Sequence, residues 1–301
     1  MVVDIRQHII TLAAVFLALG MGILIGMALV EDRALVDQQR KMIDRLEADF
    51  AALSRDRDQL RARLNLLESE LKASRKLLEE IFSKTAVGRL QGRRIAIIAV
   101  GDSLDDKEIQ GVTQAIEYAG GQVSSITKVL RPFSLSKEDD QTEMLGLLGG
   151  RAGQGEEFGE ALMEDLVSAV VGGGNLTIVP ALESLGFIAC KGDMVGPVDA
   201  ALIITGTQTQ PEIPYRDAGA HLVNALKARG MRIVVAEPSG PTVSQIKNYI
   251  SSGCTTVDDV DTPLGRIALV LALAGADGNF GFRDGAKRIL PNDFLAQLIG
   301  Q

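Results

Sequence analysis

The chain has 301 residues, of which 46% are hydrophobic and 23% are charged, and its formal net charge is −8. This composition excludes a disordered or collagen-like chain and permits a sizeable core. The acidity weighs against general nucleic-acid binding, and two cysteines are too few for a disulfide scaffold. The charge is unevenly spread: residues 1–30 are neutral overall, residues 31–83 carry −1 and residues 84–301 carry the remaining −7.

The N-terminal part, residues 1–30, contains an apolar stretch that predicts a membrane helix. Residues 9–30 hold no charge over 22 positions, enough to cross a hydrocarbon core of about 30 Å. A secretory signal has a shorter apolar region of about 7–15 residues, so we expect an uncleaved signal anchor. A removed signal peptide and a buried globular helix are the alternatives.

Small residues recur at every fourth position of this stretch, which would let two such helices pack closely. They are Ala14, Ala18, Gly22 and Gly26. The orientation of the span is open, because positive charges follow it but a span so near the N-terminus often directs the rest of the chain outward.

Residues 31–83 combine dense charge of both signs with apolar residues at heptad spacing. With position a at residue 36 and position d at residue 39, eleven of fourteen seam positions are apolar, and no Gly or Pro interrupts them. This pattern predicts a coiled-coil stalk; a single amphipathic helix lying on its own domain is the alternative. The apolar seam residues are Val36, Ile43, Leu46, Phe50, Leu53, Leu60, Leu64, Leu67, Leu71, Leu78 and Ile81.

The charges beside the seam predict a parallel dimer of two copies of the chain. In that arrangement position g of one helix faces position e of the next heptad on the other, and three such pairs are attractive. The pairs are Asp56 with Arg61, Arg63 with Glu68, and Glu70 with Arg75. Arg57 and Gln39, which occupy seam positions, would fix the register at a cost in stability.

After a linker at 84–93, strand-like and helix-like patterns alternate through residues 94–274, which predicts one globular domain. The expected strands are 94–100, 122–129, 198–205, 231–236 and 255–257. The expected helices are 105–119, 158–171, 215–228, 242–252 and 263–274, the last with Thr262 as its N-cap. Such alternation predicts a three-layer α/β sandwich with a largely parallel, Rossmann/flavodoxin-like sheet. A long loop at 131–157 and an irregular tail at 275–301, with a short helix near 293–299, complete the expectation.

The loops at the carboxyl ends of the expected strands are where an open α/β sheet binds ligands. Val100-Gly101-Asp102 has one glycine where a dinucleotide fingerprint needs three, and the chain contains no Walker A sequence. No G-x-S-x-G elbow occurs, and the only histidines are His8 and His221. We therefore expect neither a nucleotide cofactor nor a catalytic site, so the chain is not expected to be an enzyme.

Three aspartates after the last expected strand are candidate ligands for a hard cation. Asp258, Asp259 and Asp261 would supply oxygen atoms from one short loop. The alternative is a helix N-terminal box, in which acidic residues complement the helix dipole.

Cys190, Met194 and Cys254 are the candidate soft ligands, suited to Cu(I). They lie in no Cys-x-x-Cys or Met-rich motif. Two buried small hydrophobic side chains, or a disulfide, are the alternatives for the cysteines.

Two blocks of sequence carry a family resemblance. The first is RQH at 6–8, LAAVFLAL at 12–19 and GILIG at 22–26; the second is TVDDVD at 256–261, GRI at 265–267 and VLAL at 270–273. Both look like blocks of the mycobacterial outer-envelope copper transport protein family, and the order of anchor, coiled coil and α/β domain matches. The resemblance implies a cell-envelope protein of copper homeostasis or efflux whose globular domain lies outside the cytoplasm. It supplies no copper ligand at a matched position.

Two compatible hypotheses follow. One is a single-pass cell-membrane protein that serves copper homeostasis as a dimeric, non-catalytic component. The other is an envelope scaffold whose α/β domain docks another protein and binds no copper itself. The expected partners are a second copy, membrane lipid and another envelope protein, with no nucleic acid. A third hypothesis, an enzyme or small-ligand receptor, would use the strand-end loops.

Overall fold

The computed structural model describes residues 5–101, 104–130, 156–172, 174, 176–194, 196–206, 213–240, 243–283, 285–292 and 294. The chain divides into two compact units, Met1–Ala73 and Ser74–Gln301. The expected loop at 131–157 lies almost entirely outside the described residues, as does the expected short helix at 293–299.

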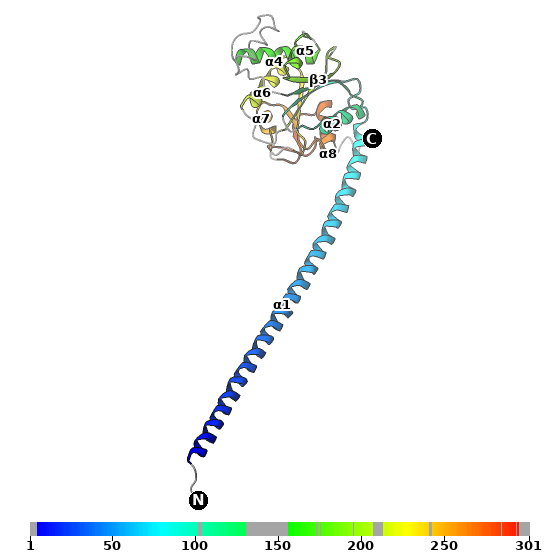
Figure 1. Cartoon of the computed structure of the whole chain (residues 1–301). Coiled ribbons are helices and arrows are strands. Elements are labelled where there is room, and N and C mark those ends of the chain that lie inside the picture. The colour runs from blue at the N-terminus through cyan, green and yellow to red at the C-terminus, as the bar shows by residue number, and fades with distance from the viewer. Residues whose placement is uncertain are drawn as a thin grey trace. The chain divides into compact units, whose positions relative to one another are not determined.

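The described residues of the first unit, 5–73, belong to the helix α1 (Ile5–Ala86; Figure 1). Within α1 the stretch Ile5–Met27 is long and apolar enough to span a membrane, and none of it is buried within the chain. This agrees with the apolar helix expected at 9–30 and fits a membrane anchor.

The second unit is built on a seven-stranded sheet in the order β3-β2-β1-β4-β5-β6-β7. The strands are β1 (Arg94–Val100), β2 (Gln122–Val129), β3 (Ile188–Gly192), β4 (Ala200–Thr205), β5 (Arg232–Ala236), β6 (Thr255–Val257) and β7 (Asn279–Phe280). Every neighbouring pair is parallel except β2 and β3. Numbered among themselves, β1, β2, β4, β5 and β6 follow the order 2-1-3-4-5 of flavodoxin-like sheets. The expected α/β sandwich is confirmed.

Helices cover both faces of this sheet, which explains why the central strands read as continuous apolar runs. One face packs against α2 (Asp106–Tyr118) and α8 (Pro263–Ala274). The other packs against α4 (Glu156–Val171), α5 (Ile178–Ser184), α6 (Ile213–Ala228) and α7 (Ile246–Ser251). In β1, for example, Ile97 faces the first set of helices and Ile98 the second.

The C-terminal end of α1 belongs to the second unit and packs on its helices. Ile81 and Phe82 contact the small cluster formed by Ile267 and Leu271 of α8. The ring of Phe82 also stacks on Tyr118 of α2, with 5.5 Å between ring centroids. Ile81, expected as the last seam residue of a coiled coil, is therefore partly covered by its own globular domain.

Both segments expected to lie outside the domain contribute to its core. Ala86 and Leu90, in the expected linker, are buried, and so are Phe280 and Phe294 in the expected tail. The elements that the sequence analysis did not anticipate are α5, β3 and β7. These are short: β3 has five residues and β7 has two, too few for a readable periodicity.

Candidate functional site

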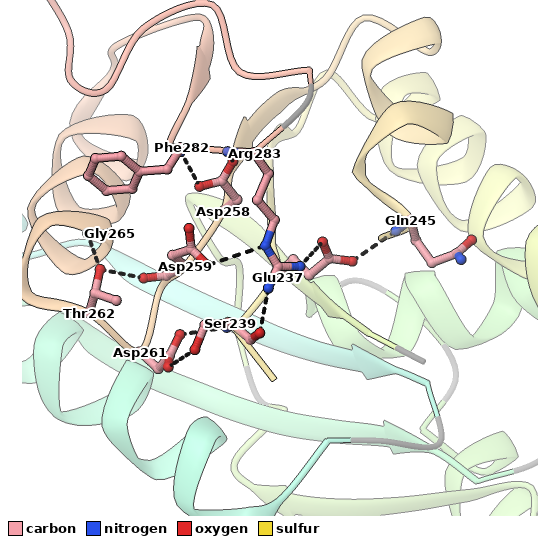
Figure 2. A network of polar contacts seen from close by, with 10 residues as sticks. All are labelled: Glu237, Ser239, Gln245, Asp258, Asp259, Asp261, Thr262, Gly265, Phe282 and Arg283. Atoms are coloured by element: carbon pink, nitrogen blue, oxygen red, sulfur yellow. Dashed lines mark hydrogen bonds and ion pairs between the residues drawn. The ribbon is translucent and has the colours of Figure 1, made fainter. Parts of the chain in front are cut away.

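Four carboxylates follow two neighbouring strands at the carboxyl edge of the sheet (Figure 2). Glu237 follows β5, whereas Asp258, Asp259 and Asp261 follow β6, which pairs with β5 in parallel. Glu237, Asp258 and Asp259 are buried, with 0%, 1% and 9% of their surface exposed. Because a buried charge is costly unless it is paired, the partners of these groups decide what the site can do.

Asp258 binds the backbone of the C-terminal segment. Its two carboxylate oxygens accept hydrogen bonds from the backbone N–H groups of Phe282, at 2.8 Å, and Arg283, at 3.0 Å. Gly281 makes this approach possible, because a Cβ atom there would lie 1.6 Å from Asp258 Oδ1. The φ angle of Gly281, +138°, also favours glycine.

Arg283 places its guanidinium among the other carboxylates (Figure 2). Its Nη1 lies 3.3 Å from Glu237 Oε2, and its Nε lies 3.3 Å from Asp259 Oδ1. The remaining nitrogen, Nη2, donates to the backbone carbonyl of Ser239. Glu237 is held from its other side by the backbone N–H of Gln245, at 2.8 Å.

Asp261 and Thr262 complete the loop after β6. The carboxylate of Asp261 accepts from the backbone N–H of Ser239 at 2.7 Å and from the hydroxyl of the same serine. The hydroxyl of Thr262 accepts from the backbone N–H of Gly265 at 3.1 Å and donates to the carbonyl of Asp259 at 2.7 Å. Thr262 is thus the N-cap of α8, as the sequence predicts, while the first turn of that helix contains no acidic residue.

The cluster holds more carboxylates than cations, and this excess of negative charge shifts the pKa values of its members. Burial and the neighbouring Asp258 carboxylate raise the pKa of Asp259, Arg283 opposes both, and the net pKa is about 6. Burial likewise raises the pKa of Glu237, against hydrogen bonds and the charge of Arg283. The single guanidinium of Arg283 therefore compensates the negative charge of more than one carboxylate.

The structure brings the three candidate aspartates to one edge, but it gives them partners from the chain itself. Asp258 and Asp259 bind the C-terminal segment through Arg283, and Asp261 binds the loop after β5. Among the described residues, no group of three or more His, Cys, Asp or Glu side chains is arranged to hold a metal ion. Chemically, the cluster anchors a chain segment.

The candidate soft ligands do not converge. Cys190 lies in β3, Cys254 directly precedes β6, and four strands separate β3 from β6. The five spacings between β3 and β6, at about 4.8 Å each, amount to roughly 24 Å, which excludes a disulfide or one Cu(I) ion shared by both thiolates. Both cysteines are free.

Both thiols lie in one apolar core cluster, on the face of the sheet that α4 to α7 cover. Burial raises the pKa of Cys190 and of Cys254, so both are protonated at neutral pH. The Cys190 thiol donates to the Thr127 hydroxyl at 3.6 Å, and Met194 packs against the same core cluster.

The crevice between β1 and β4 is where the order of the parallel strands reverses, and such crevices bind ligands in other open sheets. Here the backbones of Gly101 and Gly206 meet across it: a Cβ atom on Gly101 would lie 2.1 Å from the Gly206 carbonyl oxygen. The loop residues 102–103 and 207–212 lie outside the described part of the chain.

The candidate residues of the anchor and stalk are all on α1. Ala14, Ala18, Gly22 and Gly26 are exposed, and a Cβ atom on either glycine would meet nothing within 4 Å. The seam residues from 36 to 71 are exposed as well, whereas Leu78 and Ile81 are only partly so.

Arg283 and Glu237 are not among the site residues predicted from the sequence. Arg283 lies in the segment expected to be irregular, and its only local signal is its place two residues after Gly281 in an acidic domain. Glu237 had a stronger signal, since it directly follows a strand expected to be buried.

The family model described as copper transport outer membrane protein, MctB, matches residues 2–291 of this chain. The chain is 26% identical over 318 residues to the copper transporter MctB of Mycobacterium tuberculosis (strain H37Rv), covering 95% of this chain and 98% of that protein. The same values hold for the copper transporter MctB of Mycobacterium bovis. The counterpart of the same name in Mycobacterium leprae is 23% identical over 329 residues, with the same coverage.

Proposed function

This chain belongs to the MctB family of copper transport outer membrane proteins, and on that premise we propose that it is a membrane-anchored, dimeric and non-catalytic component of copper homeostasis in the cell envelope. The observation that carries the proposal is the family match over residues 2–291, which includes both the anchor and the α/β domain. The apolar stretch Ile5–Met27 supports attachment by a single span. The globular domain then lies outside the cytoplasm.

The globular domain serves this role by docking another envelope protein and holds no copper of its own. Two observations support this part. The carboxylates at the strand ends are engaged by Arg283 and by backbone N–H groups. The two thiols are protonated, free and on widely separated strands.

The test is the copper content and copper sensitivity of a strain that lacks the gene. We expect both to rise on deletion and to return to normal when the full chain is restored. A chain with Cys190→Ser and Cys254→Ser should restore them equally, because these thiols take no part. Immunoblots would establish equal protein levels.

Two results would change the proposal. Normal copper content and sensitivity in the deletion strain would remove the role in copper homeostasis and leave a scaffold without one. Rescue by the native chain but not by the double serine variant, at equal protein levels, would replace docking by direct copper binding. Copper titration of residues 74–301 then measures that binding; this fragment keeps Ile81 and Phe82 on the domain.

A further inference from the structure

One face of α1 presents an apolar stripe that no other residue in the described part of the chain covers. The apolar seam residues from Val36 to Leu71 are large, and each is 53–75% exposed. A shallow, mainly apolar groove runs along part of this face. Its lining is Ile43, Leu46, Glu47, Phe50, Ala51 and Ser54. A contiguous apolar surface of this kind marks an interaction site.

We infer that the occupant of this stripe is the same helix of a second copy, parallel and in register. This inference deepens the proposed function, on which it rests, by giving its dimer an interface. Heptad spacing sustained over seven heptads requires a partner helix with the same period, and a second copy has it by identity.

The flanking charges select the orientation. In a parallel pair the three attractive g–e contacts described above form, and none of the charged g–e pairs is repulsive. In an antiparallel pair centred on the same heptads, e faces e and g faces g. Like charges then meet in three pairs: Glu47 opposes Glu68, Asp49 opposes Glu70, and Arg40 opposes Arg75. The attractive charged pair of this arrangement is Asp56 with Arg63, so repulsion prevails. Charges at these positions set partner choice and orientation in coiled coils.

The globular domain sets the C-terminal limit of the interface. Ile81 has the spacing of a seam residue but contacts the cluster on α8, so the second helix cannot use it. Leu78, one turn earlier, is only partly exposed. The interface therefore extends from Val36 to about Leu71.

Arg57 interrupts the stripe at a position a, where two copies would face each other. Its guanidinium is engaged along its own helix, by Asp58 at 2.9 Å and by the Ser54 hydroxyl at 3.3 Å. Because a local carboxylate offsets its charge, the parallel pair tolerates this residue. Replacement by leucine should strengthen the dimer.

Disulfide crosslinking of the full-length chain in membranes tests the inference. Leu46→Cys introduces a thiol at position d, and Ala48→Cys introduces one at the outward position f two residues later. We expect Leu46→Cys to form a disulfide-linked dimer at least several-fold faster than Ala48→Cys. The native chain, whose cysteines are at least partly buried, gives the background. Equal rates for the two variants would overturn the stalk interface.

A mixture of chains decides the orientation. In an antiparallel pair Leu46 faces residue 71 of the other helix, so a Leu46→Cys chain would link to a Leu71→Cys chain in preference to itself. That outcome would overturn the parallel arrangement. Crosslinking measures the stalk interface without reference to copper. A result against the parallel dimer is therefore distinguishable from a result against the role in copper homeostasis.

Discussion

Arginine side chains bind other parts of the domain at both the amino and the carboxyl ends of the strands, but their partners differ between the two ends. At the amino edge, Arg93 and Arg232 donate to backbone carbonyls in residues 272–276, at the C-terminal end of α8. At the carboxyl edge, Arg283 meets the buried side chains of Glu237 and Asp259. The amino-edge arginines mainly satisfy neutral backbone carbonyls, and Arg232 also pairs with the exposed carboxylate of Asp277 at 3.1 Å. At the carboxyl edge, Arg283 balances buried ionised groups.

The contrast between the two edges predicts where the stability of the domain depends on pH. Helix carbonyls without intrahelical partners attract cations at any pH, and the last turn of α8 has no basic residue of its own. A carboxylate with a raised pKa takes up its proton at a higher pH than an ordinary one, and the pKa of Asp259 is about 6. We therefore expect the amino edge to be held equally well across the pH range, and the carboxyl edge to change with pH.

The largest effect is expected for Gly281→Ala, which places a methyl group against the Asp258 carboxylate and should lower the free energy of unfolding by about 4 kcal/mol. Gly275 is a matched control because its φ angle is +135°, against +138° for Gly281, and a Cβ atom there meets nothing within 4 Å. Gly275→Ala should cost only the backbone strain, about 1–2 kcal/mol. Urea unfolding of residues 74–301 measures both. Equal losses for the two variants would show that the hydrogen bonds of Asp258 to the backbone do not contribute to the free energy of unfolding.

Arg283→Ala should be the next most damaging change, at about 3 kcal/mol at pH 8, because it leaves Glu237 buried without its cation. The loss should shrink toward pH 5, since carboxyl groups without the guanidinium take up protons more readily. Thermal unfolding at the two pH values measures the effect.

Arg232→Ala is the control from the amino edge. It removes hydrogen bonds to the carbonyls of Ala272 and Ala276 and should cost about 2 kcal/mol. Because the two carbonyls do not titrate, and because the ion pair that Arg232 makes with Asp277 is exposed and therefore weak, the loss should be nearly the same at pH 8 and pH 5. A loss that fell as steeply as that of Arg283→Ala would contradict the contrast between the edges.

Asp259→Asn isolates the titrating group. The folded-state pKa of Asp259 is about 6, against an ordinary value of 3.8, so the folded state binds more protons between these values. The native chain should therefore lose stability as the pH rises from about 4 through 6, by on the order of 2–3 kcal/mol. The asparagine variant lacks this contribution. As the pH rises over this window, the unfolding free energy of the variant should therefore increase relative to that of the native chain. If the difference between the two stayed constant, a group other than Asp259 would cause the pH dependence.

Much of the domain could be predicted because its signals are local. The strands β1, β4 and β5 are apolar on both faces, and Thr262-Pro263 marks the start of α8. The carboxyl-edge aspartates were identified for the same reason, as polar residues directly after a buried strand. What their position did not reveal was their partner.

The partners depend on contacts between distant residues. Asp258 and Arg283 lie 25 positions apart, and no periodicity specifies which backbone N–H groups a carboxylate will meet. Ile81 is similar, because its heptad spacing is the same whether it faces a second helix or α8. Elements as short as β3 and β7 escape for a different reason: pairing with an existing sheet stabilises them, and their own sequence does not.

The smallest expected effect comes from Thr262→Ala, which removes the N-cap of α8 and should cost about 1 kcal/mol. Thr262→Ser is the control, since a serine hydroxyl can make the same bonds to Gly265 and Asp259. The loss should not vary between pH 5 and pH 8, because a hydroxyl does not titrate there. Chemical unfolding at both pH values would then show whether pH dependence follows the location of a residue or its chemistry. Thr262 lies at the carboxyl edge, but the effect of its replacement should be independent of pH, as for the arginines of the amino edge. The pH sensitivity of the domain would therefore reside in the buried carboxylates and not in their edge of the sheet.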